Sequence, residues 1–153
     1  MTRVDFYHLQ TWPLEKALPP LLEKVRSAGH RAVLLAGSSA RVEAIAALLW
    51  TYAPDCWLPH GSTVDGQAAL QPIWLTTLDE NPNKADVLVL TDGMDSAHKA
   101  KYWRCLDLFD GHDSAAVASA RDRWRACRAA GFVLFYWQQT EPSGGWKLSG
   151  PNE

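Results

Sequence analysis

The sequence lacks the features of a membrane or exported protein. No apolar stretch approaches the length that spans a bilayer. The N-terminus, MTRVDFYHLQ, has no apolar run followed by a small-residue cleavage site. The three cysteines form no CxxC pair, which fits free thiols in a reducing compartment better than a disulfide framework. We therefore expect a cytoplasmic protein that does not contact a membrane.

The chain also lacks an excess of positive charge. Its formal net charge is −2 and its pI is near 6.2, whereas nonspecific nucleic-acid binding needs many clustered cations. Any role on DNA is therefore expected to be indirect. With 153 residues, 47% of them hydrophobic, the chain is long enough for one domain with a sizeable core. We expect a single domain at 1–141 and a loosely ordered C-terminal tail at 142–153, which is rich in Gly, Pro and Ser.

Motifs of nucleotide and metal chemistry are missing too. The best candidate for a phosphate loop, Ala36-Gly37-Ser38-Ser39, has one glycine and no lysine, so it matches neither GxGxxG nor GxxxxGK[ST]. Asp92 and Asp95 are typical of a turn, and His60 has no recognisable nucleophile paired with it. The histidines and cysteines show no zinc spacing. We predict no cofactor, no metal and no catalytic activity, with a nucleotide-dependent α/β enzyme as an alternative.

Short apolar runs alternate with helical stretches along the chain. We expect strands at 3–9, 31–36, 73–77, 87–91, 105–109 and 132–137, and helices at 13–28, 40–50 and 114–130. The runs RAVLLA and VLVLT are typical of strands buried on both faces. This alternation predicts a three-layer α/β fold whose sheet is largely parallel, or mixed, with helices on both faces. Such a fold is Rossmann-like, here without a nucleotide-binding motif.

The most informative stretch runs from Asp113 to Phe132. Its helix begins with Asp113 or Ser114 as the N-cap and ends at Gly131, a residue type that tolerates a left-handed conformation. Between residues 121 and 128 there are four arginines and one acid, a local charge of +3 in a chain of net charge −2. The remainder therefore sums to −5, and the basic strip is a local feature.

One face of this helix combines arginines with apolar side chains. At about 100° per residue, Arg121, Arg125 and Arg128 fall within roughly 60° of one another. Val117 and Trp124 lie beside them. Arginine forks suit carboxylates and phosphates, and an aromatic neighbour adds an apolar floor. The pattern predicts a docking site for an acidic segment with an apolar side chain; alternatively, the arginine stems only cover apolar surface.

Eight tryptophans are many for a chain of this size. Most are expected in the core. Trp50 ends a helix and Trp57 lies in the loop after it, so both are expected nearer the surface. Exposed tryptophans close together are typical anchors of a protein interface, and packing of the loop on the helix is the alternative. Exposed tryptophans beside arginines also leave open a protein that binds single-stranded DNA directly.

Several segments, in this order, resemble the chi subunit of bacterial DNA polymerase III holoenzyme. They are FY at 6–7, LLW at 48–50, WLPH at 57–60, DLFDG at 107–111, ARDRW at 120–124 and YWQQ at 136–139. The resemblance runs from about Arg3 to Trp146. It implies a noncatalytic accessory subunit of the clamp-loader assembly in DNA replication, with a Rossmann-like fold that has lost nucleotide chemistry.

The resemblance also implies two partners. In that family one surface binds the psi subunit, which links chi to the clamp loader, and another binds the acidic C-terminal tail of single-stranded-DNA-binding protein. The psi-binding residues it implies are Trp50, Trp57, Pro59 and His60. The tail-binding residues are Arg121, Trp124 and Arg125, to which helical phase adds Arg128 and Val117. DNA would then be reached through the partners.

Overall fold

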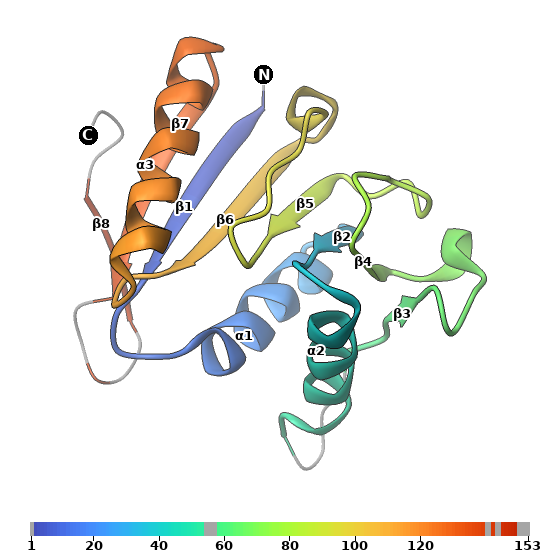
Figure 1. Ribbon diagram of the computed structural model, residues 1–153. Coiled ribbons are helices and arrows are strands. Elements are labelled where there is room, and N and C mark those ends of the chain that lie inside the picture. Colours follow the sequence, from blue (N-terminus) through green and yellow to red (C-terminus); the bar gives the residue numbers. More distant parts are fainter. Residues whose placement is uncertain (1, 54–57, 140–141, 143–144, 150–153) are drawn as a thin grey trace.

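One eight-stranded sheet forms the centre of the protein, whose structure is a computed structural model (Figure 1). The structure describes residues 2–53, 58–139, 142 and 145–149. The strands are β1 (Arg3–Leu9), β2 (Ala32–Leu35), β3 (Gly61–Ser62), β4 (Ile73–Thr76), β5 (Val87–Leu90), β6 (Arg104–Asp110), β7 (Val133–Gln139) and β8 (Trp146–Leu148). The helices are α1 (Leu14–Ser27), α2 (Ser39–Thr51) and α3 (Ser114–Ala129), with 3-10 turns at Ala68–Leu70 and Lys99–Lys101.

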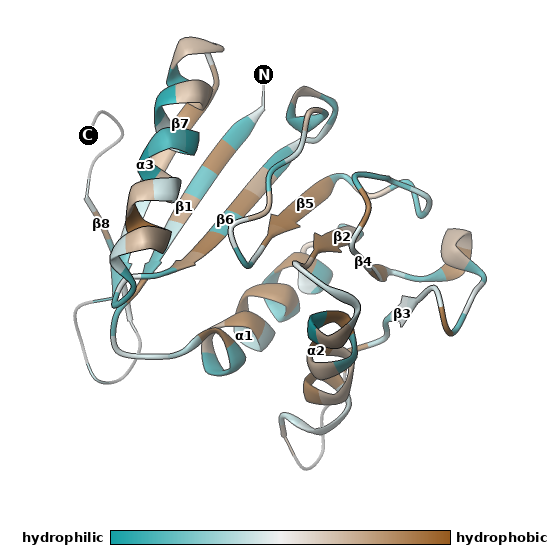
Figure 2. Ribbon diagram, in the orientation of Figure 1, coloured by the Kyte–Doolittle hydropathy of each residue, from teal (hydrophilic) through white to brown (hydrophobic). Residues whose placement is uncertain are grey.

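The strand order is β3-β4-β2-β5-β6-β1-β7-β8. Neighbouring strands are parallel throughout, except that β8 runs antiparallel to β7. The prediction of an α/β fold with a largely parallel or mixed sheet is confirmed. Every residue of β2, β4 and β5 is buried, and Figure 2 shows β2 and β5 as hydrophobic along their length. Continuous apolar runs are what a strand covered on both faces requires.

Helices cover the two faces of the sheet and create two hydrophobic cores. Leu18 and Leu22 of α1 and Leu49 of α2 belong to one core, and Trp124 and Cys127 of α3 belong to the other. Figure 1 shows α3 lying across β1 and β7. Strand β1 contributes to both cores because successive side chains of a strand point to opposite faces. Among the described residues, no helix is long and apolar enough to cross a membrane.

Helix α1 forms although Pro19 and Pro20 lie inside it. Each proline removes one backbone donor from the helix. Burial of Leu18, Leu21 and Leu22 against the sheet offsets this loss, because most helical stability in proteins comes from packing of an apolar face.

Two strands were not expected from the sequence. Strand β3 has two residues and pairs with β4 at the sheet edge. Strand β8 lies within the segment expected to be a loose tail, and Trp146 packs edge-on against Tyr7 with ring centroids 5.0 Å apart. The boundary between a domain and a loosely ordered tail at residue 142 stays a prediction.

Candidate interaction sites

Local signals fix the position of α3. The Asp113 carboxylate caps the helix by accepting hydrogen bonds from the backbone N–H groups of Ala115 and Ala116 at 3.0 and 3.4 Å. The helix stops before Gly131, whose φ of +85° is a left-handed value that glycine adopts without strain. The helix therefore begins and ends as the sequence predicts, with Asp113 as its N-cap.

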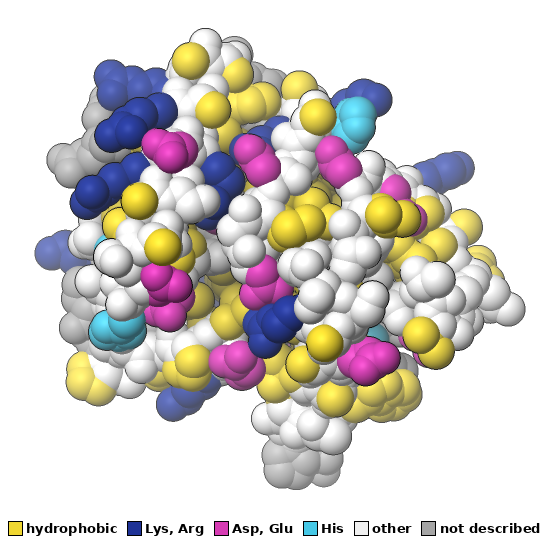
Figure 3. Space-filling model, in the orientation of Figure 1, with side chains coloured by type: hydrophobic (Ala, Val, Ile, Leu, Met, Phe, Trp, Pro, Cys, Tyr) yellow, Lys and Arg dark blue, Asp and Glu magenta, His cyan; other side chains and the backbone are white. Residues whose placement is uncertain are grey.

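A groove of about 440 Å³ lies between α3 and β7. We call it the α3/β7 groove. Its lining includes all five residues predicted for tail binding, which are Val117, Arg121, Trp124, Arg125 and Arg128. No acidic residue lines it among the described residues. In Figure 3, Lys and Arg side chains gather at the upper left, over and beside α3. The groove is a concave, positively charged surface with an apolar interior.

Trp124 forms the floor of the groove. Its side chain is only 8% exposed. The ring meets Phe6 of β1 edge-on at 5.2 Å between centroids and Tyr136 of β7 edge-on at 5.8 Å. The sequence suggested an aromatic edge beside the arginines, and the structure instead buries most of the ring beneath them. An apolar side chain entering the groove would meet a fixed aromatic surface.

The exposed arginines form the rim of the groove. Arg121, Arg125 and Arg128 are exposed on α3. Arg125 forms an ion pair with Asp122 at 3.2 Å, in which both side chains are more than 70% exposed. Such surface pairs contribute little stability. The guanidinium groups can therefore turn to an incoming carboxylate at small cost.

Arg123 does not belong to this rim. Its side chain is 5% exposed, and it donates two hydrogen bonds to the Asp107 carboxylate on β6, from Nε at 2.6 Å and from Nη2 at 3.0 Å. A third hydrogen bond joins Arg123 Nη1 to Ser119 Oγ at 2.7 Å. The local charge of +3 counted from the sequence therefore overstates the exposed charge, since this arginine is neutralised inside the protein.

Strand β7 supplies groove residues that the sequence did not reveal. Tyr136 and Gln138 line the groove opposite α3. The Tyr136 hydroxyl contacts Nδ1 of His8 on β1. Burial raises the pKa of Tyr136 and lowers the pKa of His8. Successive side chains of the segment YWQQ point to opposite faces of the sheet, which the sequence alone predicts. Which of the two faces carries the groove depends on the position of α3.

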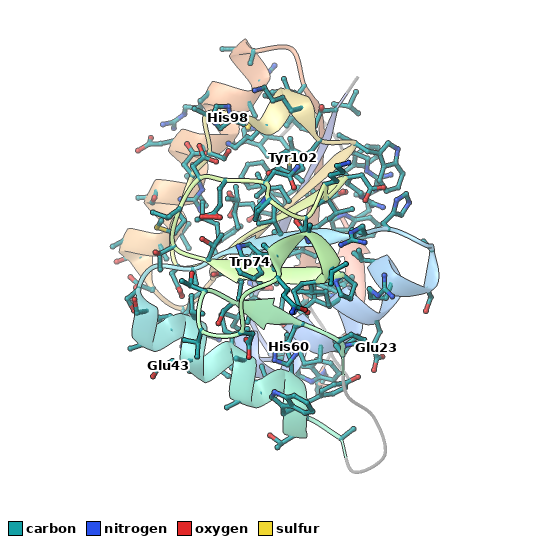
Figure 4. The ribbon with its side chains drawn as sticks, turned by 90° about the vertical axis from the view of Figure 1, so that its right-hand side faces the viewer. Glu23, Glu43, His60, Trp74, His98 and Tyr102 are labelled. Carbon is teal, nitrogen blue, oxygen red and sulfur yellow. The ribbon has the colours of Figure 1, made fainter. Side chains whose placement is uncertain are left out.

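A second candidate surface surrounds the end of α2. Trp50 is 57% exposed, and its ring meets His60 edge-on with centroids 5.6 Å apart. A backbone hydrogen bond from Leu58 N to Leu49 O, 3.3 Å long, ties residue 58 to the helix. Figure 4 shows His60 between β3 and α2. The structure thus brings Trp50 and His60 together, with half-buried Pro59 beside them. We call this the Trp50 surface; Trp57 lies outside the described residues.

The candidate phosphate loop is occupied by the protein's own groups. The Ser38 hydroxyl caps α2 by accepting a hydrogen bond from Arg41 N at 3.2 Å. The Asp92 carboxylate accepts hydrogen bonds from Gly37 N at 3.0 Å and from Arg41 Nε at 3.2 Å. An incoming phosphate would meet this carboxylate at the helix N-terminus. Asp95 instead forms an ion pair with Lys99 at 2.6 Å.

Within the described ranges, no three or more His, Cys, Asp or Glu residues gather where they could hold a metal ion. Cys105 and Cys127 are buried free thiols. Burial raises the pKa of Cys105 to about 12.

Comparison with known families identifies the chain. The sequence model of the family described as "DNA polymerase III chi subunit, HolC" matches residues 1–134. The chain belongs to this family. A curated relative, "Probable DNA polymerase III subunit chi" from Rickettsia prowazekii (strain Madrid E), is 36% identical over 97 residues. The aligned part covers 63% of this chain and 59% of the relative, so less than two thirds of that protein is spanned.

The chi-family match contains the Trp50 surface and part of the α3/β7 groove. Residues 1–134 contain α2, His60 and the whole of α3. The residues of β7 that face the α3/β7 groove, Tyr136 and Gln138, lie just beyond the match. The resemblance noted from the sequence is thus confirmed at the level of the chi family and of DNA replication, whereas the roles of individual residues stay predictions.

Proposed function

We propose that the chain is a noncatalytic accessory subunit of the DNA polymerase III clamp-loader complex in the cytoplasm. It bridges the psi subunit and the acidic C-terminal tail of single-stranded-DNA-binding protein. The observation that supports this most is the α3/β7 groove, in which three exposed arginines surround an aromatic floor. Membership of the chi family supports the replication role.

The groove suits a peptide end that is both acidic and apolar. Acidic side chains and the terminal α-carboxylate would contact Arg121 and Arg125, with Arg128 extending the positive rim. The apolar side chain would pack between Val117 and Trp124. Charge-assisted hydrogen bonds contribute about 1.5–3 kcal/mol each. Three of them, together with burial of the apolar side chain, approach the ~8 kcal/mol of a micromolar complex.

The psi subunit would bind at the Trp50 surface. An exposed tryptophan supported from one side by His60 is a typical hot spot of a protein interface. Trp57 and Pro59 would complete this surface. Psi would then link the chain to the clamp loader, and DNA would be reached through both partners.

The deciding experiment is isothermal titration with a short peptide that has an acidic C-terminus of the single-stranded-DNA-binding-protein type. We expect saturable binding by the wild type and at least about a hundredfold weaker binding by Arg121→Glu, because attraction at the rim becomes repulsion. Lys101→Glu, the same change of charge on an exposed residue outside the groove, is the matched control and should bind as the wild type does. Equal affinity in wild type and Arg121→Glu would rule out the groove as the tail site.

A further inference from the structure

A second cavity lies on the other face of the same strands. It measures about 250 Å³ and is bounded by α1 on one side and by residues of β1, β6, β7 and β8 on the other. Its aromatic lining consists of Tyr7, Trp103, Trp137 and Trp146. We call it the Trp103 cavity. It belongs neither to the α3/β7 groove nor to the Trp50 surface, since it shares no residue with them.

The side chains that line the Trp103 cavity carry more positive than negative charge. Its ionisable lining residues, besides Tyr7, are Lys24, His30 and Arg104, with no carboxylate among the described ones. Just outside the lining, His30 is paired with Asp86, so the positive charge comes from Lys24 and Arg104. The chain as a whole has a net charge of −2, so the cavity is locally basic against the overall trend. A ligand with negative charge matches it.

A buried carboxylate holds the Arg104 side chain in place. Asp5 is fully buried and accepts hydrogen bonds from Arg104 Nε at 2.5 Å, from Arg3 Nη2 at 2.9 Å and from the Trp137 indole at 3.0 Å. One carboxylate therefore faces two guanidinium groups, which leaves an excess of one positive charge. Arg104 is 27% exposed, so part of it remains open to solvent. The cation is oriented before any ligand arrives.

The Trp103 ring is presented beside these cations. It is 53% exposed and stacks on His30 with centroids 4.2 Å apart and planes inclined by 21°. The Arg104 guanidinium carbon lies 5.9 Å from the ring centroid. Stacking on His30 restricts the tryptophan to one orientation. A flat, exposed ring next to a fixed cation, here Arg104, is the arrangement on which proteins stack the bases of single-stranded nucleic acid.

We infer that the Trp103 cavity binds single-stranded DNA, with one base against the aromatic rings and a neighbouring phosphate on Arg104 and Lys24. The paired bases of a duplex do not expose their faces, so a single strand is favoured. An acidic peptide would match the cations but leaves the planar aromatic surface without a planar partner. The family's place in DNA replication is consistent with this ligand.

The cavity and the α3/β7 groove can be filled together. Along β7, Tyr136 and Gln138 line the groove, whereas Trp137 between them lines the cavity. The sheet therefore separates the two ligands. This inference does not depend on tail or psi binding, and it adds a direct DNA contact to a protein otherwise expected to reach DNA through its partners.

The test is fluorescence anisotropy of a fluorescein-labelled oligo-dT of about 15 nucleotides, titrated with the full chain at about 50 mM salt. We expect weak, saturable binding that Trp103→Ala reduces at least about fivefold and that Trp103→Phe, which keeps an aromatic face, largely retains. Leu78→Ala removes an exposed large apolar side chain outside the cavity and outside both proposed partner surfaces, and it should bind as the wild type does. Thermal unfolding checks that each variant is folded.

Three outcomes would overturn the inference. The first is no binding by the folded wild type at low salt. The second is equal binding by Trp103→Ala and wild type. The third is displacement of the oligonucleotide by the acidic tail peptide, which would place the DNA in the α3/β7 groove. Because the peptide titration is a separate measurement, failure of this inference leaves the tail-binding proposal intact, and the reverse also holds.

Discussion

The α3/β7 groove and the Trp50 surface differ in chemistry although the same sheet supports both. The groove combines exposed arginines with a buried floor, whereas the Trp50 surface presents an exposed ring supported by His60. They also lie on different helices, α3 and α2, which pack into different cores. The difference teaches that two surfaces of one small domain can respond differently to a condition such as salt concentration. Four experiments would break or sharpen this contrast.

The largest expected effect is a loss of stability caused by a substitution inside α3. Arg123→Ala would leave the buried Asp107 carboxylate without its partner, and loss of one member of a buried ion pair costs about 3–5 kcal/mol. Urea unfolding followed by circular dichroism would measure this loss. Arg125→Ala, on the exposed side of the same helix, should change stability by less than about 0.5 kcal/mol. If the two variants were equally stable, the division of α3 into a structural and a binding face would be wrong.

The second effect is expected at the Trp50 surface. Trp50→Ala should weaken psi binding by about 2 kcal/mol or more, roughly thirtyfold, because a hot-spot aromatic is removed. Co-elution of chain and psi on gel filtration, followed by titration, would measure it. Affinity for the acidic peptide should not change. Retention of psi at the wild-type level would mean that Trp50 is only packed against its own loop.

A smaller effect is expected from salt, which should change the binding affinity at one surface more than at the other. Raising the salt concentration from about 50 mM to about 300 mM should weaken binding of the acidic peptide several-fold, because salt screens exposed charges. Psi binding at the Trp50 surface should change little over the same range, since apolar burial is its driving force. Parallel titrations of both partners provide the comparison. The same salt dependence for both would contradict the assignment of charge to one and apolar contact to the other.

The smallest effect concerns pH. Burial lowers the pKa of His8, which lies behind the groove against Tyr136. The unfolded chain therefore binds a proton at this position more readily than the folded chain does, and stability decreases as pH falls below about 6.5. His8→Gln should lose less stability than the wild type between about pH 7 and pH 5.5. Parallel loss in both proteins would show that His8 is not responsible.

Much of the fold follows from the sequence because its signals are local. The apolar runs of β2 and β5, the Asp113 cap and the Gly131 stop each depend on a few adjacent residues. Strand β3 was missed because two residues, Gly61 and Ser62, show no periodicity. Strand β8 was missed because its neighbours are rich in Gly, Pro and Ser, and only pairing with β7 defines it.

The candidate groove was predictable on its helical side only. Helical phase groups Arg121, Arg125 and Arg128 correctly, because a fixed rotation per residue relates them. The burial of Arg123 depends on Asp107, which is 16 residues away on another strand. The contribution of Tyr136 depends on where α3 crosses β7. Tertiary contacts of this kind have no local signal in a single sequence.

The central place of β1 has a consequence for the order in which the protein can be built. Its paired neighbours are residues 104–110 of β6 and 133–138 of β7. During synthesis β1 leaves the ribosome about 100 residues before β6 and about 130 residues before β7, so its two edges stay unpaired until those strands emerge. Both faces of β1 also await their covering helices, and the last of these, α3, ends at residue 129. Strand β1 is thus made before both of its neighbours, and it is enclosed only after β6, α3 and β7 have been made.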